Sequence, residues 1–213
     1  MTELIEKLST KTVDHHVEWQ PQPALYNQQI NPDHIAFLMI DMQERLLPKM
    51  ADSAEIIGNN LKFLQVCALF RLPVIYTEQY PQGLGSTIPE IKEALDKCEA
   101  AGCPMLYFSK TRMSVLTANL SLFLRQHNIK QLIVAGIESH VCIYQSCRDI
   151  LSEGYSIFLP EDMTSSRRTE HKKQALHLLD KLGATVNNLE MLIFDLLQDS
   201  KAPNFKACQA LIK

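Results

Sequence analysis

The feature that most constrains the fold of this chain is an alternation, from residue 34 onward, of short apolar runs with longer amphipathic stretches. Apolar runs of strand length, bounded by turn-forming or polar residues, are typical of strands buried on both faces of a parallel sheet. Such runs lie at residues 34–40, 73–77, 104–108, 131–135 and 155–159, and a weaker one lies at 184–187.

Amphipathic stretches of helical length separate these runs. Residues 54–70 and 115–125 place apolar side chains at a period of about 3.6. Residues 141–153 and 170–182 are each followed by a glycine, which commonly terminates a helix. Repeated alternation of strand and helix implies a mostly parallel sheet with helices on both faces. We therefore predict an α/β fold, a three-layer α/β/α sandwich of Rossmann-like type.

The length of 213 residues fits one domain. Residues 1–33 are polar and interrupted by prolines, and we interpret them as an N-terminal surface extension. Residues 34–200 form the predicted domain, with a last helix at 189–197. A further helix at 205–212, within the tail 201–213, is expected to pack on the domain or on a neighbouring subunit. The sequence leaves that choice open.

Charge and hydropathy disfavour two classes of partner. The net charge is −3, and no run of Lys or Arg supplies the basic surface that salt-driven nucleic-acid binding needs. No apolar run approaches the roughly 18 residues of a membrane span, and the first residues lack the apolar core of a signal peptide. We therefore expect a cytoplasmic protein that binds neither nucleic acid nor membrane.

The six cysteines include no C-x-x-C pair and no zinc-finger spacing. Cys98 and Cys103, in the segment CEAAGC, could bind a metal or oxidise. The alternative is that both are plain free thiols.

Three chemically active side chains follow predicted strands. Asp41 ends the first run, Lys110 follows the third, and Cys142 follows the fourth through the loop GIESH. Because ligands bind beyond the carboxyl ends of parallel strands, we expect this acid, cation and thiol to converge. Each also has a simpler interpretation. Asp41 with Glu44 matches a helix capping box, Lys110 could be a solvated surface residue, and Cys142 could be a small buried apolar residue.

The position of Cys142 favours a catalytic role. If Ser139 caps the following helix, Cys142 is its third residue, where free N–H groups and the helix dipole favour a thiolate or an oxyanion. Cys147 lies in the helix body and is expected to be structural. His140 is a weaker candidate for a catalytic base, because its place on the same turn is expected to point the ring elsewhere.

Three segments carry a family resemblance. HIAFLMIDMQ, FSKTRMSV and VAGIESHVCIYQSCRDILSEG resemble the signature regions of the isochorismatase-like (cysteine hydrolase) superfamily, which includes nicotinamidases and N-carbamoylsarcosine amidases. The resemblance covers residues 34–200. The segments TEQYPQGLGSTIPEI, DMTSSR and PNFKACQALIK are similar to the isochorismatase domain-containing branch, whose substrates are poorly defined.

The resemblance implies a six-stranded parallel sheet and a catalytic triad of Asp41, Lys110 and Cys142. Asp41 would take the thiol proton, Lys110 would orient the pair, and Cys142 would attack a carbonyl carbon to give a thioester. The resemblance also implies an oxyanion hole formed by the N–H groups of Val141 and Cys142. It implies a cis peptide bond at Ile137–Glu138.

Two departures from the family pattern reduce the number of reactions that this chain is expected to catalyse. Nicotinamidases bind a metal through histidines after the second strand, whereas TEQYPQGLGST contains no histidine. We therefore expect no metal and no cofactor, and we disfavour nicotinamide as the substrate. Isochorismatases that cleave a vinyl ether do not depend on a cysteine nucleophile, so the presence of Cys142 argues for acyl chemistry.

Five further residues are predicted to line the substrate pocket: Gln43, Glu78, Gln79, Tyr80 and Met113. The alternative for the residues after the second strand is a polar turn, and the alternative for Gln43 is a capping role. Arg167, with Arg168 beside it, could bind a substrate carboxylate, although a surface or interface salt bridge is the simpler interpretation.

The leading hypothesis is a metal-independent hydrolase that acts on a small amide or related acyl substrate. The alternatives are a catalytically silent binding or scaffold protein and a redox-responsive protein in which Cys142 oxidises reversibly. Because members of the resembled family commonly form dimers or larger assemblies, we also expect a homo-oligomer.

Overall fold

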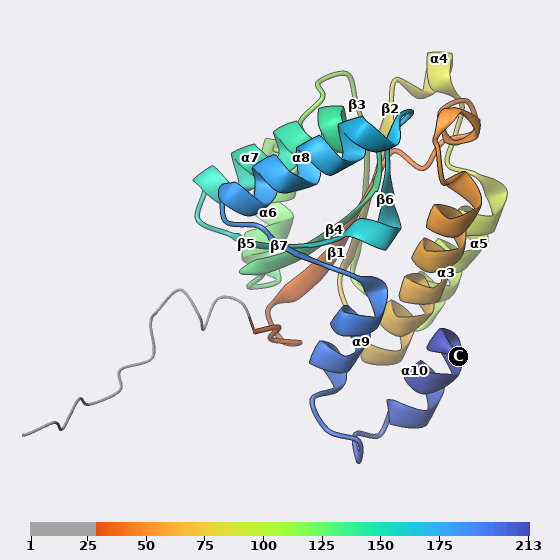
Figure 1. Ribbon diagram of the computed structural model, residues 1–213. Helices are drawn as coiled ribbons and strands as arrows, with labels where there is room; N and C mark the ends of the chain where they lie inside the picture. The colour runs from red at the N-terminus through yellow and green to blue at the C-terminus, as the bar shows by residue number, and fades with distance from the viewer. Residues whose placement is uncertain (1–28) are drawn as a thin grey trace, which may run out of the picture.

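A parallel sheet forms the middle layer of the computed structural model, which describes residues 29–213 (Figure 1). Most of the extension expected at residues 1–33 lies outside the described residues. The strands are β1 (Ile35–Ile40), β2 (Val74–Gln79), β3 (Met105–Lys110), β4 (Gln131–Ile137), β5 (Ser156–Pro160), β6 (Thr164–Ser165) and β7 (Thr185–Asn187). Their order is β3-β2-β1-β4-β5-β7, and the short β6 pairs with β4.

Every pairing between these strands is parallel. The α/β/α sandwich is therefore confirmed, with the two-residue β6 added to the six expected strands. One expectation about burial is wrong. Strand β3 lies at the sheet edge, and its side chains before Lys110 are only partly buried or exposed, with Tyr107 46% exposed.

Helices cover both faces of the sheet (Figure 1). On one face lie α3 (Ser53–Phe70), α5 (Pro89–Ala100), α9 (Leu189–Leu197) and α10 (Phe205–Ile212). On the other lie α6 (Ala118–Gln126), α7 (Tyr144–Ser152) and α8 (Thr169–Lys181). Shorter helical turns are η1 (Leu47–Lys49), α4 (Pro81–Leu84), η2 (Ser139–Ile143) and η3 (Glu161–Met163).

Two hydrophobic cores form, one on each face, because successive side chains of a strand point to opposite sides. In β1, Phe37 and Met39 join the core beneath α3 and α5, whereas Leu38 and Ile40 join the core beneath α6 and α7. Helix α10 packs on the chain's own domain through the fully buried Cys208.

Among residues 29–213, no helix combines the length and the apolar composition that crossing a membrane requires.

Candidate active site

Asp41 is held at the carboxyl end of β1 by two hydrogen bonds. Its backbone is left-handed (φ 59°), a conformation that Asp tolerates better than most residues. The buried carboxylate accepts hydrogen bonds from Thr77 Oγ1 and from Lys110 Nζ, each at 2.7 Å. No helix begins within the three residues that follow, so the capping-box interpretation of Asp41 with Glu44 is wrong.

Lys110 ends β3 with a buried ammonium group. The residue is 7% exposed, and Nζ donates to Asp41 Oδ2 at 2.7 Å and to Gln79 Oε1 at 2.8 Å. Lys110 is therefore not a solvated surface residue. Burying an ion pair costs solvation free energy, so a buried pair at the ligand-binding edge of a sheet marks a functional candidate.

The loop before Cys142 turns through left-handed residues. No peptide bond in residues 29–213 is cis, so the cis bond expected at Ile137–Glu138 is wrong. The chain turns instead at Gly136 (φ 118°) and Glu138 (φ 61°), with trans peptides. A Cβ on Gly136 would lie 2.1 Å from the carbonyl oxygen of Ile40. Strand β4 can therefore run this close to β1 only with glycine at this position.

Cys142 lies in the π-helical turn η2, which leads directly into α7. Glu138 occupies the N-cap position, so the expected cap at Ser139 is wrong, and the Ser139 hydroxyl donates instead to the carbonyl oxygen of Ser165 at 2.9 Å. The N–H of Val141 donates to the carbonyl oxygen of Glu138 at 2.8 Å. Val141 is therefore engaged within the turn, and an oxyanion-binding role for the N–H of Cys142 stays a prediction.

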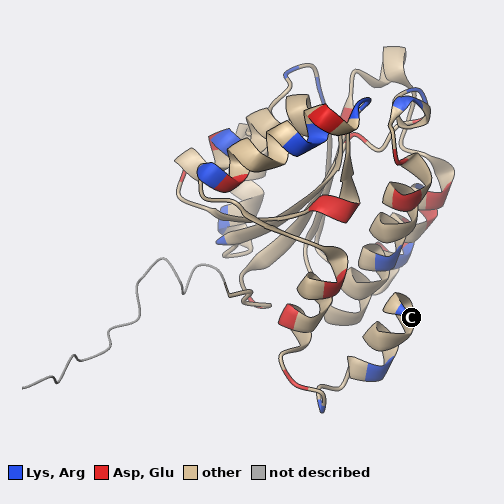
Figure 2. Ribbon diagram, viewed as in Figure 1, with Lys and Arg blue, Asp and Glu red and all other residues tan. Residues whose placement is uncertain are grey.

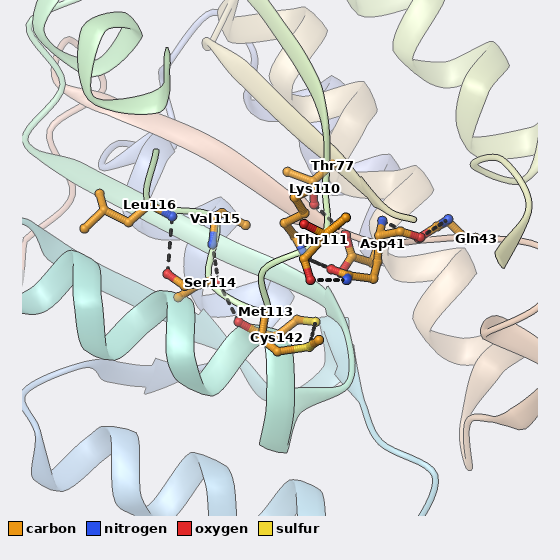
Figure 3. A network of polar contacts seen from close by, with 12 residues as sticks. Asp41, Gln43, Thr77, Lys110, Thr111, Met113, Ser114, Val115, Leu116 and Cys142 are labelled. Carbon is orange, nitrogen blue, oxygen red and sulfur yellow. Dashed lines mark hydrogen bonds and ion pairs between the residues drawn. The ribbon is translucent and has the colours of Figure 1, made fainter. Parts of the chain in front are cut away.

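The Cys142 thiol is buried close to Asp41 and Lys110 (Figure 3). The residue is 5% exposed, and its sulfur lies 3.9 Å from the sulfur of Met113. Burial, together with the Asp41 carboxylate, raises the pKa of the Cys142 thiol to about 12, and the Lys110 ammonium acts in the opposite direction. Burial and the Asp41 carboxylate therefore outweigh the positive field of Lys110, and the resting group is a thiol.

A cavity of about 420 Å³ opens onto Cys142. Of the five predicted pocket residues, Gln79, Tyr80 and Met113 line it. Its other lining residues are Leu46, Lys49, Met50, Leu84, Glu138, Val141 and Arg167. The walls are mainly apolar, which is typical of a small-molecule site with a few polar groups that orient the ligand.

Two predicted pocket residues have structural contacts instead. Gln43 is buried, and its amide Nε2 donates to the carbonyl oxygens of Gln79 and Gly85 at 3.0 and 2.6 Å. Glu78 accepts hydrogen bonds from the Thr87 N–H at 2.7 Å and from the Tyr107 hydroxyl at 2.8 Å. Neither lines the Cys142 cavity, so both predictions are wrong.

The polar side chains near Cys142 are held by contacts with other residues. Arg167 forms a two-point ion pair with Glu138, with Nε–Oε1 at 3.0 Å and Nη2–Oε2 at 3.2 Å, and both residues line the cavity. His140 contacts Ser166 through Nδ1 at 3.0 Å, and its ring packs against His171 at a centroid distance of 4.7 Å. These contacts occupy His140 away from the thiol.

Thr77 is a site residue that the sequence reasoning missed. It lies beside Ile40 in the β1–β2 register, which places its hydroxyl against the Asp41 carboxylate. Thr77 is the polar residue that ends the apolar run 73–77, and that was the available signal. Leu46 and Met50 carried a weaker signal, as apolar residues in the segment after the Asp41 strand.

Within residues 29–213, no group of three His, Cys, Asp or Glu side chains is placed to hold a metal ion.

Comparison with known proteins identifies the family. The family model "Isochorismatase domain" matches residues 35–191. "Isochorismatase domain-containing protein 2" of Danio rerio is 34% identical over 177 residues, covering 82% of this chain and 85% of that protein. "Isochorismatase domain-containing protein 1" of Danio rerio is 31% identical over 185 residues, covering 86% of this chain but only 62% of that protein.

A solved structure agrees with these relatives. The structure described as MAR1 ribonuclease from Caenorhabditis elegans superposes with a TM-score of 0.80 and 32% identity, covering 86% of this chain and 92% of that one. The chain therefore belongs to the isochorismatase family, has that family's hydrolase fold, and is similar to its isochorismatase domain-containing branch.

Proposed function

We propose that this chain is a metal-independent cysteine hydrolase that cleaves a small amide or related acyl substrate through a thioester at Cys142. The observation that carries the proposal is the buried Asp41–Lys110 ion pair, with 2.7 Å between Nζ and Oδ2, acting on a thiol that faces a cavity. Acid, cation and nucleophile are the groups that acyl transfer requires, and three separate strand ends supply them.

The raised pKa of Cys142 decides how the reaction starts. Because the resting group is a thiol, its proton must leave as the sulfur attacks, and Asp41 is the acceptor. Lys110 keeps Asp41 in place and charged until that transfer. The carbonyl carbon then bonds to Sγ, and the amine leaves with the proton from Asp41. Water then attacks the thioester and gives a proton to Asp41. The C–S bond breaks, Asp41 returns that proton to the sulfur, and the carboxylic acid leaves.

The cavity limits the class of substrate. A volume of about 420 Å³ lies at the small end of the usual range for ligand sites, so the acyl part is a small molecule. The apolar walls from Leu46, Met50, Leu84 and Met113 favour an uncharged acyl group beside the nucleophile. Lys49 and the Glu138–Arg167 pair place polar contacts around that apolar surface.

A redox role for Cys142 is disfavoured by the same geometry. Cysteines that sense oxidants have a lowered pKa, whereas burial raises the pKa of Cys142.

A turnover screen tests the proposal. Wild type is incubated with a panel of small amides, esters and carbamoyl compounds, next to Cys142→Ala and the matched control Cys147→Ala, whose thiol is buried in the following helix. Wild type and Cys147→Ala should release product from at least one compound, and Cys142→Ala should release none. Equal turnover by Cys142→Ala, or binding without turnover by wild type, would overturn the proposal.

A further inference from the structure

A second group of thiols lies on the opposite side of the sheet from Cys142. Cys67 on α3, Cys98 on α5 and Cys103 before β3 belong to the core beneath α3 and α5. Cys142 and Cys147 belong to the core beneath α6, α7 and α8. The hydrolytic mechanism uses none of the first three thiols.

The end of helix α5 brings two of these thiols together. The N–H of Cys103 donates to the carbonyl oxygen of Cys98 at 3.0 Å, and the N–H of Gly102 donates to that of Glu99 at 2.9 Å. Gly102 has φ 90°, the left-handed conformation that this pair of bonds requires. The arrangement is a Schellman motif. In this motif the side chains of the two residues joined by the bond with the wider sequence span commonly pack against each other. Here those residues are Cys98 and Cys103.

Both thiols also rest on the same stretch of α3. Cys98 Sγ donates to the carbonyl oxygen of Leu64 at 3.2 Å, and Cys103 Sγ donates to that of Cys67 at 3.4 Å. These two acceptors are three residues apart on one helix, which separates them by about 4.5 Å along its axis. The sulfur atoms are therefore confined to neighbouring positions by two independent sets of contacts.

The two thiols differ in pKa and in exposure, the two properties that decide which of them reacts first with an oxidant. The neighbouring Cys98 thiol and the Arg71 guanidinium lower the pKa of Cys103, whereas the pKa of Cys98 is raised. Cys103 is 5% exposed, whereas Cys98 is fully buried. A small oxidant therefore reaches Cys103 first, and Cys103 is the better nucleophile.

We propose that Cys98 and Cys103 are a reversible dithiol–disulfide site, oxidised by hydrogen peroxide and reduced by a small-molecule thiol. The sulfur of Cys103 attacks one peroxide oxygen, the O–O bond breaks, and Cys103 becomes a sulfenic acid as water is released. The sulfur of Cys98 then loses its proton and displaces the hydroxyl from Cys103, releasing a second water. Two thiols and one peroxide thus give one disulfide and two waters.

Tryptic digestion separates the possible products. Cleavage after Lys97 and Lys110 places both cysteines on the peptide 98–110, whereas Cys67 falls on the peptide 63–71. Folded protein is treated with dilute hydrogen peroxide, and the remaining thiols are alkylated. The peptide masses of the tryptic digest are then measured by mass spectrometry. The peptide 98–110 should be unalkylated and lighter by two hydrogen atoms, and dithiothreitol should restore alkylation of both cysteines.

Variants make the assignment specific. Cys98→Ser and Cys103→Ser should each abolish the lighter peptide, and the matched control Cys67→Ser should retain it, with thermal melts showing that each variant is folded. A cross-link between 98–110 and 63–71, a sulfinic acid on Cys103 beside an alkylated Cys98, or two alkylated thiols after peroxide would each overturn the proposal.

Discussion

Two buried residues act on the proton of Cys142 in opposite directions. The Asp41 carboxylate raises the pKa of the thiol, and the Lys110 ammonium lowers it, while burial sets the overall value at about 12. Asp41 and Lys110 are themselves joined at 2.7 Å, so a change in either one also changes the field that the other exerts. The reactivity of Cys142 is therefore a property of all three residues.

Alkylation of Cys142 by iodoacetamide should report these opposing effects. In wild type the rate at about pH 8 should be low and should rise about tenfold per pH unit until the pH approaches the pKa of about 12. Asp41→Asn should move the rate profile to lower pH, because a negative charge is removed. Lys110→Met should move it to higher pH, although both variants should lose turnover. Shifts in the same direction, measured by mass spectrometry, would contradict this arrangement.

The ion pair should show strong coupling in stability. Removing one partner leaves an unpaired buried charge, so Lys110→Met should lower the free energy of unfolding by about 3–5 kcal/mol. Asp41→Asn with Lys110→Met should cost less than the sum of the two single changes, because neither charge then remains. Urea unfolding of the four proteins measures this coupling. Additive effects would mean that the two side chains do not interact in the folded state.

At the scale of elements, the close parallel pairing of β1 and β4 sets the position of the active-site loop. Ile40 and Gly136 are register partners, and the loop to Cys142 begins directly after this contact. A left-handed glycine at the end of β4 therefore connects the packing of the sheet to the placement of the nucleophile.

Gly136→Ala should damage both stability and activity. Its Cβ would lie 2.1 Å from the carbonyl oxygen of Ile40, and φ 118° is strained for alanine, so a loss of at least about 2 kcal/mol is expected. Gly58→Ala is the matched control. Gly58 lies inside helix α3 with no atom within 4 Å of the added Cβ, so this change should be neutral or stabilising by up to about 1 kcal/mol. Equal thermal stability of both variants would contradict the close approach.

All the strands except β6 were predictable because each contains a short apolar run, and their observed bounds differ from the expected ones by only a few residues. Asp41, Lys110 and Cys142 could be brought together because the carboxyl ends of parallel strands share one edge. Helix α5 was missed because few of its residues are buried and charged residues fill the rest.

The orientation of individual side chains was less predictable. Gln43 and Glu78 are polar residues near the site, but the register of β2 and the loop after it turn them into structural contacts. The conformation of the turn before Cys142 could not be predicted from the local sequence pattern either. The left-handed conformation of Glu138 depends on how β4 is connected to η2. Local sequence identified the residue types, and tertiary packing decided which of them face the cavity.

At the scale of the whole molecule, Lys and Arg are not gathered into one continuous basic surface along the helices of residues 29–213. Blue and red segments are interspersed along the outer helices in Figure 2, and the net charge is −3. One structural neighbour is described as a ribonuclease, but a protein that binds RNA tightly through phosphates needs a concentrated positive surface.

RNA binding should accordingly be weak. Fluorescence anisotropy with a labelled single-stranded oligonucleotide at physiological salt should show no saturable binding at micromolar protein concentrations. Lowering the salt should restore little affinity, since few counterions are released. Tight binding with a steep salt dependence would show that phosphate contacts exist which the charge distribution does not reveal.

The most direct measurement is the mass of a trapped acyl-enzyme. Protein is mixed with an activated ester of a small apolar acid, quenched with acid, digested and fragmented. The peptide 131–148 contains Cys142 and Cys147, and the acyl group should be found on Cys142 alone. It should persist in Cys147→Ala and vanish in Cys142→Ala. An acyl group on Cys147, or turnover without any adduct in every variant, would contradict Cys142 as the nucleophile.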